Sequence, residues 1–242
     1  MCRTGAWFRV RGGVVTRTMS GRSAFIGTVR LMVVMQAADG ESTRSARGPG
    51  VTLGLLAGVA VGLGVGALTA YGQGWLSDET TSLANSAGPW SVAAFLVARY
   101  NRRLVPAVVA AMLTLASCEL GYAVATELRG GTNATSTVAF WFTAAIFAGP
   151  PLGVAGAWST ETGLRPGVGL SVLGGVLLGE GLYGWSTVAD TTDWRYWVIE
   201  LSIGALVISF AAARRQWPLD AMLTLAAGMF TAAVVFAFGR LA

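Results

Sequence analysis

Three glutamates, Glu119, Glu180 and Glu200, lie within apolar stretches of this sequence. An acid inside a membrane segment is a candidate functional residue, because burying it is costly. Glu119 and Glu180 each precede a tyrosine by three residues, namely Tyr122 and Tyr183. This spacing places the acid and the phenol on the same helix face. We therefore predict an outward-facing polar pocket that binds a substrate or ion through these five side chains.

The three acids are expected at one level of the membrane. Counted from the predicted outer ends of their segments at about 1.5 Å per residue, they lie roughly 6 to 10 Å below the outer surface of the membrane core. Asn85 would lie slightly above them and is included in the predicted pocket. Either Arg129 or Arg195 reaches down from an outer loop to neutralise the acids, or the acids bind protons. At this depth a glutamate side chain can also extend to water, so a purely structural or interfacial role stays open.

The residue types that are missing restrict the chemistry. The chain has no histidine, and its two cysteines, Cys2 and Cys118, lie far apart in the sequence. Haem ligation, most zinc sites and most general bases depend on histidine. No pairing of a nucleophile with a base is recognisable either. We expect no metal site, no cofactor and no enzymatic activity.

The apolar runs recur at the length of a membrane span. Of 242 residues, 54% are hydrophobic and only 12% are charged, and the mean hydropathy is +0.60. About 20 apolar residues are needed to cross a bilayer as a helix. The sequence therefore predicts an all-α, polytopic transmembrane helix bundle of seven helices, the second of them short. The predicted segments are 51–71, 88–100, 104–126, 136–157, 167–185, 196–213 and 219–238.

The distribution of arginine predicts the orientation of the bundle. If all seven segments cross, 14 of the 17 basic residues, all of them arginine, share one side of the membrane. Positive residues are enriched on the cytoplasmic side. This bias favours an N-in, C-out, multi-pass protein of the bacterial inner (cytoplasmic) membrane. Five tryptophans would then form an aromatic belt near the outer interface, namely Trp75, Trp90, Trp185, Trp194 and Trp197.

Residues 1–49 differ from the predicted membrane domain, 50–242, because they contain eight arginines and no run long enough to span a bilayer. We interpret them as a basic, disordered cytoplasmic tail near anionic lipid. The alternatives are a weak amphipathic anchor and a mis-assigned start codon, with Met35 as a natural beginning. Residues 1–50 carry a formal charge of +6 and residues 51–242 carry −1, which together give the net charge of +5. The basic composition is therefore no argument for nucleic acid, and the lipid bilayer is the expected partner.

Small residues recur every four positions in two of the segments. Such spacing lets helix backbones approach closely. We expect these faces to pack within the chain, with a homo-oligomer or a membrane partner subunit as the alternative. The residues are Gly54, Gly58, Gly62 and Gly66 in the first segment, and Gly167, Ser171, Gly175 and Gly179 in the fifth.

Two further features concern the arrangement of the helices. Tyr71 and Trp90 recur as Tyr122 and Trp141, both displaced by 51 residues, which would fit duplicated helical hairpins. The alternative is that each helix needs an aromatic residue where it meets the outer membrane interface, which would give the same spacing without a repeat. The adjacent prolines Pro150–Pro151 are expected to kink or break the fourth helix.

Several features of the sequence occur together: the glycine-rich first segment, the stretch Leu83-Ala84-Asn85-Ser86, Trp90, Ala94-Phe95 and the acid-bearing later helices. In these features the chain resembles an uncharacterised family of actinobacterial integral membrane proteins. The resemblance covers about residues 51–242 and implies a membrane location without a substrate. Our leading hypothesis is a small-solute or cation transporter, or the membrane-embedded binding subunit of one. The alternative is a non-transporting structural or assembly partner that docks through its glycine-striped helices.

Overall fold

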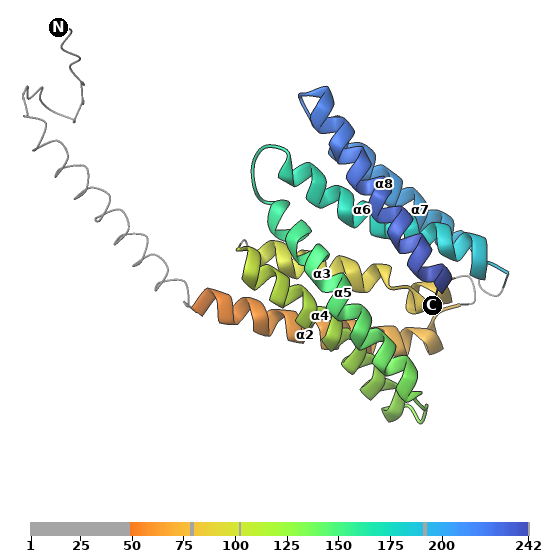
Figure 1. Cartoon of the computed structure of the whole chain (residues 1–242). Helices are drawn as coiled ribbons and strands as arrows, with labels where there is room; N and C mark the ends of the chain where they lie inside the picture. Colours follow the sequence, from red (N-terminus) through yellow and green to blue (C-terminus); the bar gives the residue numbers. More distant parts are fainter. Residues whose placement is uncertain (1–48, 78–79, 102, 191–192, 242) are drawn as a thin grey trace, which may run out of the picture. The chain divides into compact units, whose positions relative to one another are not determined.

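The computed structural model describes residues 49–77, 80–101, 103–190 and 193–241. The predicted tail therefore lies almost entirely outside the described residues. Within these ranges the chain forms seven α-helices and no strand, and the residues from Pro49 onward form one compact unit (Figure 1). The helices are α2 (Pro49–Trp75), α3 (Gly88–Asn101), α4 (Leu104–Leu128), α5 (Thr135–Trp158), α6 (Arg165–Tyr183), α7 (Trp194–Ala213) and α8 (Pro218–Leu241).

Six of these helices are long and apolar enough to cross a membrane, judged by length and composition. They are α2, α4, α5, α6 with the π-helical turn Gly184–Val188 that continues it, α7 and α8. The prediction of a multi-pass helical membrane protein is thereby confirmed. Helix α3, with 14 residues, is about 21 Å long at 1.5 Å per residue, which is shorter than a membrane core of about 30 Å.

Helices α2 and α4 run side by side in the same direction. A side chain at Gly58 would meet the Ala110 carbonyl, and one at Gly66, two turns later, would overlap the Cys118 carbonyl. The contact points advance together along both helices, so the helices are parallel. The glycine face is what permits this approach, because it leaves room for the backbone of α4.

Helix α3 returns the chain between these two parallel helices. Its last residue, Asn101, lies against Gly54 near the start of α2, whereas Trp90 near its beginning donates a hydrogen bond to Thr69 near the end of α2 (3.0 Å). Helix α3 is therefore antiparallel to α2. The short second segment thus runs back along α2, from near its end toward its start.

The last three helices repeat this arrangement. Helices α6 and α8 are parallel, since Gly167 faces Thr224 and Gly179 faces Val235. Helix α7 is antiparallel to α6, with Gly181 facing Leu201 at one point and Gly174 facing Ile208 farther along. In Figure 1 the first group, α2 to α4, is coloured orange to yellow-green, and the second group, α6 to α8, is coloured teal to blue.

The repetition in the structure is therefore one of three-helix units, not of the two-helix hairpins that the aromatic spacing suggested. Helix α5 lies between the two units in the sequence and packs against α3, α4 and α6. It is continuous from Thr135 to Trp158 and includes Pro150–Pro151, so the expected break is absent. Gly149 and Gly153, on both sides of the prolines, lie directly against Met112 and Val108 of α4.

Candidate functional site

Two of the three membrane acids meet at the N-terminal end of α3. The Glu180 carboxylate accepts a hydrogen bond from the backbone N–H of Ala87 (2.6 Å). The Glu200 carboxylate accepts one from the Ser86 hydroxyl (3.3 Å) and is only 4% exposed. Helices α6 and α7 thus each contribute one acid to the loop that precedes α3.

These acids lie beside the first turn of α3, where the sequence has no capping side chain. The Ala87 carbonyl accepts the first helical hydrogen bond, from Ser91 N–H, which makes Ala87 the N-cap residue. An alanine side chain cannot accept hydrogen bonds from the free N–H groups of a helix end. Glu180 and Glu200 lie at this end and complement its partial positive charge. The location of both acids therefore has a structural explanation.

Ser86 is the centre of this arrangement. Its hydroxyl oxygen accepts hydrogen bonds from Gly88 N–H (3.0 Å) and from the Tyr196 hydroxyl (2.8 Å), while its own proton goes to Glu200. A side chain at Gly88 would overlap the Glu200 carboxylate, so the carboxylate would have to move away from the α3 entry loop. We call Ser86, Ala87 and Gly88 the α3 entry loop.

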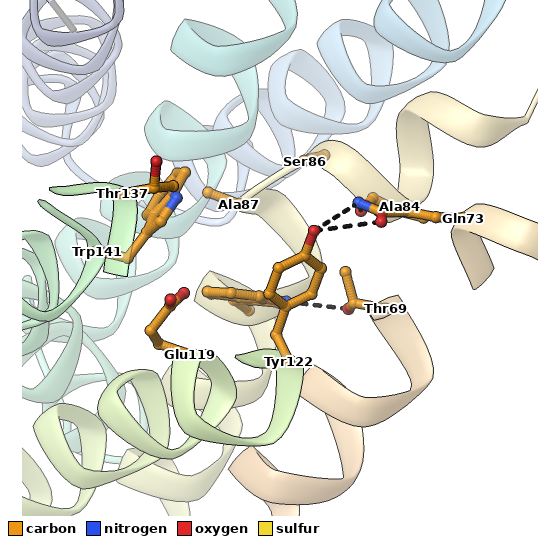
Figure 2. Close-up of a pocket in the computed structure, with 10 residues that line it drawn as sticks. Thr69, Gln73, Ala84, Ser86, Ala87, Glu119, Tyr122, Thr137 and Trp141 are labelled. Atoms are coloured by element: carbon orange, nitrogen blue, oxygen red, sulfur yellow. Dashed lines mark hydrogen bonds between the residues drawn. The ribbon is translucent and has the colours of Figure 1, made fainter. Parts of the chain in front are cut away.

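Glu119 lies apart from the other two acids, in a small pocket of about 110 Å³ that is partly open to the surroundings. Its side chain is 2% exposed, and one of its carboxylate oxygens has no hydrogen-bond partner among the described residues. Figure 2 shows the carboxylate aimed into the space between Trp141 and Tyr122. The pocket is lined by Thr69, Gln73, Ala84, Ser86, Ala87, Trp90, Glu119, Tyr122, Thr137 and Trp141.

The neutral polar groups of the pocket bind one another. The Tyr122 hydroxyl and the Gln73 amide are within hydrogen-bond distance (3.1 and 3.2 Å), and Gln73 also donates to the Ala84 carbonyl (3.3 Å). The indole N–H of Trp90 donates to the Thr69 hydroxyl. Figure 2 marks these hydrogen bonds. Among the described lining residues, Glu119 is the one acid, and none is basic.

We expect Tyr122→Phe to reduce the free energy of unfolding by about 0.5–1.5 kcal/mol, the usual contribution of one hydrogen bond. The substitution removes the phenol that pairs with Gln73 and keeps the ring. Thermal unfolding of the purified protein in detergent would measure the effect. Tyr183→Phe is the matched control, because Tyr183 packs its ring against Gly239 of α8. An equal loss in both variants would contradict the prediction.

The other residues predicted for the pocket occupy different places. Asn85 ends the short 3-10 helix Thr81–Asn85, directly before the α3 entry loop, and its side chain is not among the described ones. Tyr183 does not line the Glu119 pocket, since it lies between α6 and α8. The structure therefore brings together Glu119 with Tyr122, and Glu180 with Glu200. Ser86 and Ala87 join the two groups, because they line the pocket and also bind the two carboxylates.

The predicted helix-packing glycines face other helices of the same chain. A side chain at Gly54 would overlap Asn101 of α3, and one at Gly62 would overlap the Thr114 carbonyl of α4. Gly58 and Gly66 likewise face α4, while Gly175 and Gly179 face α8.

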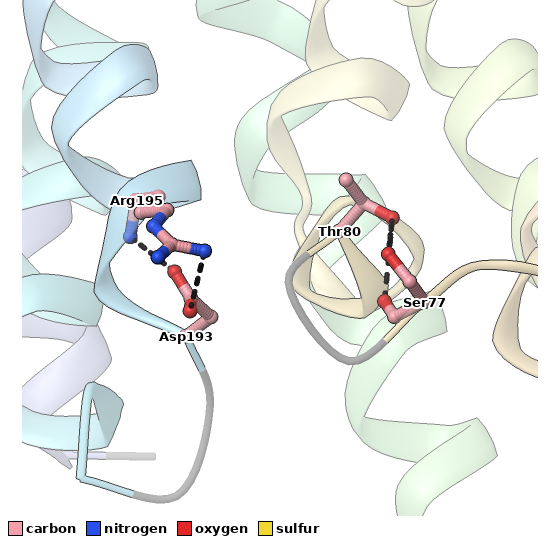
Figure 3. A network of polar contacts seen from close by, with 4 residues as sticks. All are labelled: Ser77, Thr80, Asp193 and Arg195. Atoms are coloured by element: carbon pink, nitrogen blue, oxygen red, sulfur yellow. Dashed lines mark hydrogen bonds and ion pairs between the residues drawn. The ribbon is translucent and has the colours of Figure 1, made fainter.

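The two arginines expected to reach the acids, Arg129 and Arg195, bind other groups in the structure. Arg129 donates a hydrogen bond to the Ala70 carbonyl and lies over the Tyr71 ring, 5.5 Å from its centre. Arg195 pairs with Asp193 (3.7 Å), whose side chain also caps α7. Figure 3 shows this pair, and separately the hydrogen-bonded hydroxyls of Ser77 and Thr80 after α2. Within the described ranges the remaining ion pair joins Arg165 to Glu161, so none includes a membrane acid.

Sequence reasoning missed several pocket residues. It assigned Trp90 to the interfacial belt, yet Trp90 is only 9% exposed and lines the pocket. Trp197 is also buried, at 4%, because it packs on Gly184, whereas Trp75, Trp185 and Trp194 are more than half exposed. The serine directly before Ala87-Gly88-Pro89 was an available signal for Ser86, since serine favours helix beginnings.

The chain belongs to a family of unknown function, DUF6518, which matches residues 44–242. This agrees with the resemblance to an uncharacterised membrane protein family. No curated protein and no solved structure matches the chain.

Proposed function

We propose that this protein binds a small solute in the Glu119 pocket, as a transporter or as the membrane-embedded binding subunit of one. Family membership assigns no activity, so the proposal rests on the site itself. The single observation that carries it is the Glu119 carboxylate, which is buried, has one oxygen without a partner and lines an open pocket.

The energetic argument follows from the cost of such a group. A buried polar group without a hydrogen bond costs free energy, and removing a partner from a buried group costs about 1–3 kcal/mol. Glu180 and Glu200 each also keep one oxygen without a partner, but their other oxygen binds the α3 entry loop. No hydrogen bond joins Glu119 to another described residue, so its carboxylate is the least satisfied of the three. A solute that binds the free oxygen would remove the penalty, which favours a ligand-binding role for Glu119.

The helical arrangement also supports a transport role. Many secondary transporters are built from repeated helical units, and their substrate sites lie where discontinuous helices begin or end inside the membrane. Here a short helix begins at Gly88 beside the pocket, within the first of two three-helix units. A shared architecture does not determine function, so this is secondary support.

The scaffold alternative depends on glycine faces that are free for a partner. Gly54, Gly62 and Gly66 face α3 or α4 of the same chain, and Gly179 faces α8. These faces are therefore occupied, and the alternative has no observation in its favour.

The binding proposal can be tested with purified full-length protein in detergent. We would screen amino acids, sugars, organic acids and amines for a rise in the unfolding temperature, first with the wild type and then with Glu119→Gln. The expected result is a solute that stabilises the wild type and loses its effect in Glu119→Gln. Glu127→Gln is the matched control, because Glu127 is on the same helix but exposed. If no solute shows this dependence on Glu119, the proposal is wrong.

We further propose the N-in, C-out orientation in the bacterial cytoplasmic membrane, which places the pocket at the outer end of the bundle. Single cysteines would test it in a Cys2→Ser, Cys118→Ala background. Thr160→Cys lies in the exposed α5–α6 turn, and Ser186→Cys lies at the exposed opposite end of α6. In intact cells a membrane-impermeant maleimide should label position 186 and should label position 160 only after permeabilisation. The reverse pattern would show that the orientation is inverted.

A further inference from the structure

The walls of the Glu119 pocket are largely aromatic. Trp90 of α3 lies at the centre of three rings, with its ring centre 6.2 Å from that of Tyr122 of α4 and 5.8 Å from that of Trp141 of α5. Both neighbouring rings are tilted by about 60° against Trp90. The pocket therefore presents ring surfaces from three different helices to anything that enters it.

The hydrogen-bonding groups of two of these rings already have partners within the protein. The Trp90 N–H binds Thr69, whose hydroxyl in turn donates to the Val65 carbonyl (2.9 Å), and the Tyr122 hydroxyl binds Gln73. Their hydrogen-bonding groups thus contribute to holding the rings in place. What the pocket offers a ligand is the aromatic surface together with one acidic side chain, Glu119.

An aromatic surface beside a carboxylate favours a positively charged ligand. The face of an aromatic ring carries partial negative charge, and it attracts ammonium groups by roughly 0.5–2 kcal/mol, most strongly for tryptophan. Glu119 adds the negative group, and no basic side chain lines the pocket to neutralise it. An anionic solute would face repulsion from both features.

A bare metal ion does not fit this set of groups. Calcium takes six to eight oxygen ligands, and magnesium takes six in octahedral geometry. Within the described residues no group of three or more acidic, histidine or cysteine side chains could hold a metal ion. The hydroxyl of Thr69 and the amide of Gln73 are engaged with neighbouring groups.

We propose that the Glu119 pocket binds an organic monocation, namely an alkylated or quaternary ammonium compound. Its charge lies against the Glu119 carboxylate, and its N-alkyl groups lie against Trp90, Trp141 and Tyr122. This inference rests on the proposed solute-binding function and adds the chemical class of the solute.

The test compares choline with 3,3-dimethyl-1-butanol, which has the same shape without the charge. Binding to the purified full-length protein is measured by isothermal titration calorimetry and by tryptophan fluorescence, with sodium and potassium chloride as inorganic controls. We expect choline or tetramethylammonium to bind and the neutral analogue to bind at least tenfold more weakly. Equal binding of choline and its neutral analogue, or no binding of either ammonium probe, would overturn the proposal.

Two variants separate the contribution of the carboxylate to ammonium binding from that of the aromatic rings. Glu119→Gln should weaken ammonium binding at least tenfold, and Trp141→Leu should weaken it roughly 3- to 30-fold, the range of a cation–π contact. Glu127→Gln should leave binding unchanged. Loss of folding in Glu119→Gln would not remove the test, because the comparison of charged and neutral probes uses the wild-type protein.

The outcomes also separate this inference from the proposed function. If the ammonium probes fail while a neutral or anionic solute binds in a Glu119-dependent manner, the organic-cation inference is wrong and solute binding stands. If no solute of any class depends on Glu119, both are wrong.

Discussion

Replacing Gly66 with alanine is expected to reduce the free energy of unfolding by about 1–3 kcal/mol, the usual cost of overpacking. The added methyl group would overlap the Cys118 carbonyl and would lie 2.8 Å from the Tyr122 backbone nitrogen. Both are backbone atoms of α4, so no side-chain rotation can relieve the overlap. The two helices would have to separate, which loses the close contact that the glycine face permits. Unfolding of the purified protein by heat or by SDS would measure the change.

Gly64→Ala is the control for this experiment. Gly64 is in the same helix turn as Gly66, but an added methyl group would meet nothing within 4 Å. Alanine is the better helix former by about 1 kcal/mol, so Gly64→Ala should be neutral or slightly stabilising. If both variants lost the same stability, the loss would not come from the packing of α2 on α4, and the prediction would be wrong.

The second large effect is expected for Ser86→Ala. This substitution removes the acceptor of the Gly88 N–H and of the Tyr196 hydroxyl, and it removes the donor to Glu200. A buried polar group left without a partner costs about 1–3 kcal/mol, and Ser86 and Glu200 are both at most 4% exposed. We expect a loss of stability within or above this range, together with a lower affinity of the pocket, because Ser86 also lines it.

Ser202→Ala provides the comparison for Ser86→Ala. Ser202 is on α7 and exposed, and its hydroxyl donates to the Val198 carbonyl of the same helix (2.7 Å). Alanine in its place keeps all backbone hydrogen bonds, so stability should change by less than about 0.5 kcal/mol. A neutral Ser86→Ala variant would show that the α3 entry loop does not depend on this serine.

The acids of the membrane segments thus differ in role although they resemble one another in the sequence. Glu180 and Glu200 bind the α3 entry loop through the Ala87 N–H and the Ser86 hydroxyl. All three acids keep one oxygen without a partner, but only Glu119 among them lines the pocket, and no described residue binds its carboxylate. For this reason we expect substitutions of Glu180 and Glu200 to reduce stability first, and substitutions of Glu119 to affect binding first.

The sequence by itself determined the helical membrane architecture, because span length and hydropathy are properties of contiguous residues. The runs predicted at 104–126 and 196–213 correspond closely to α4 and α7. The four-residue spacing of small side chains likewise predicted which faces of α2 and α6 allow close packing. That face is a property of one helix and needs no knowledge of its neighbours.

Only the tertiary structure decided how the candidate site is composed. Ser86 and Glu200 are separated by 114 positions, and Ala87 and Glu180 by 93, yet each pair forms a hydrogen bond. The equal spacing of acid and tyrosine in α4 and α6 could not distinguish Tyr122 from Tyr183, because the difference depends on which helix packs opposite each one. The packing of α3 against its neighbouring helices places Trp90 in the pocket and brings Ser86 to Glu200. No local sequence pattern encodes that packing, because it depends on residues far apart in the chain.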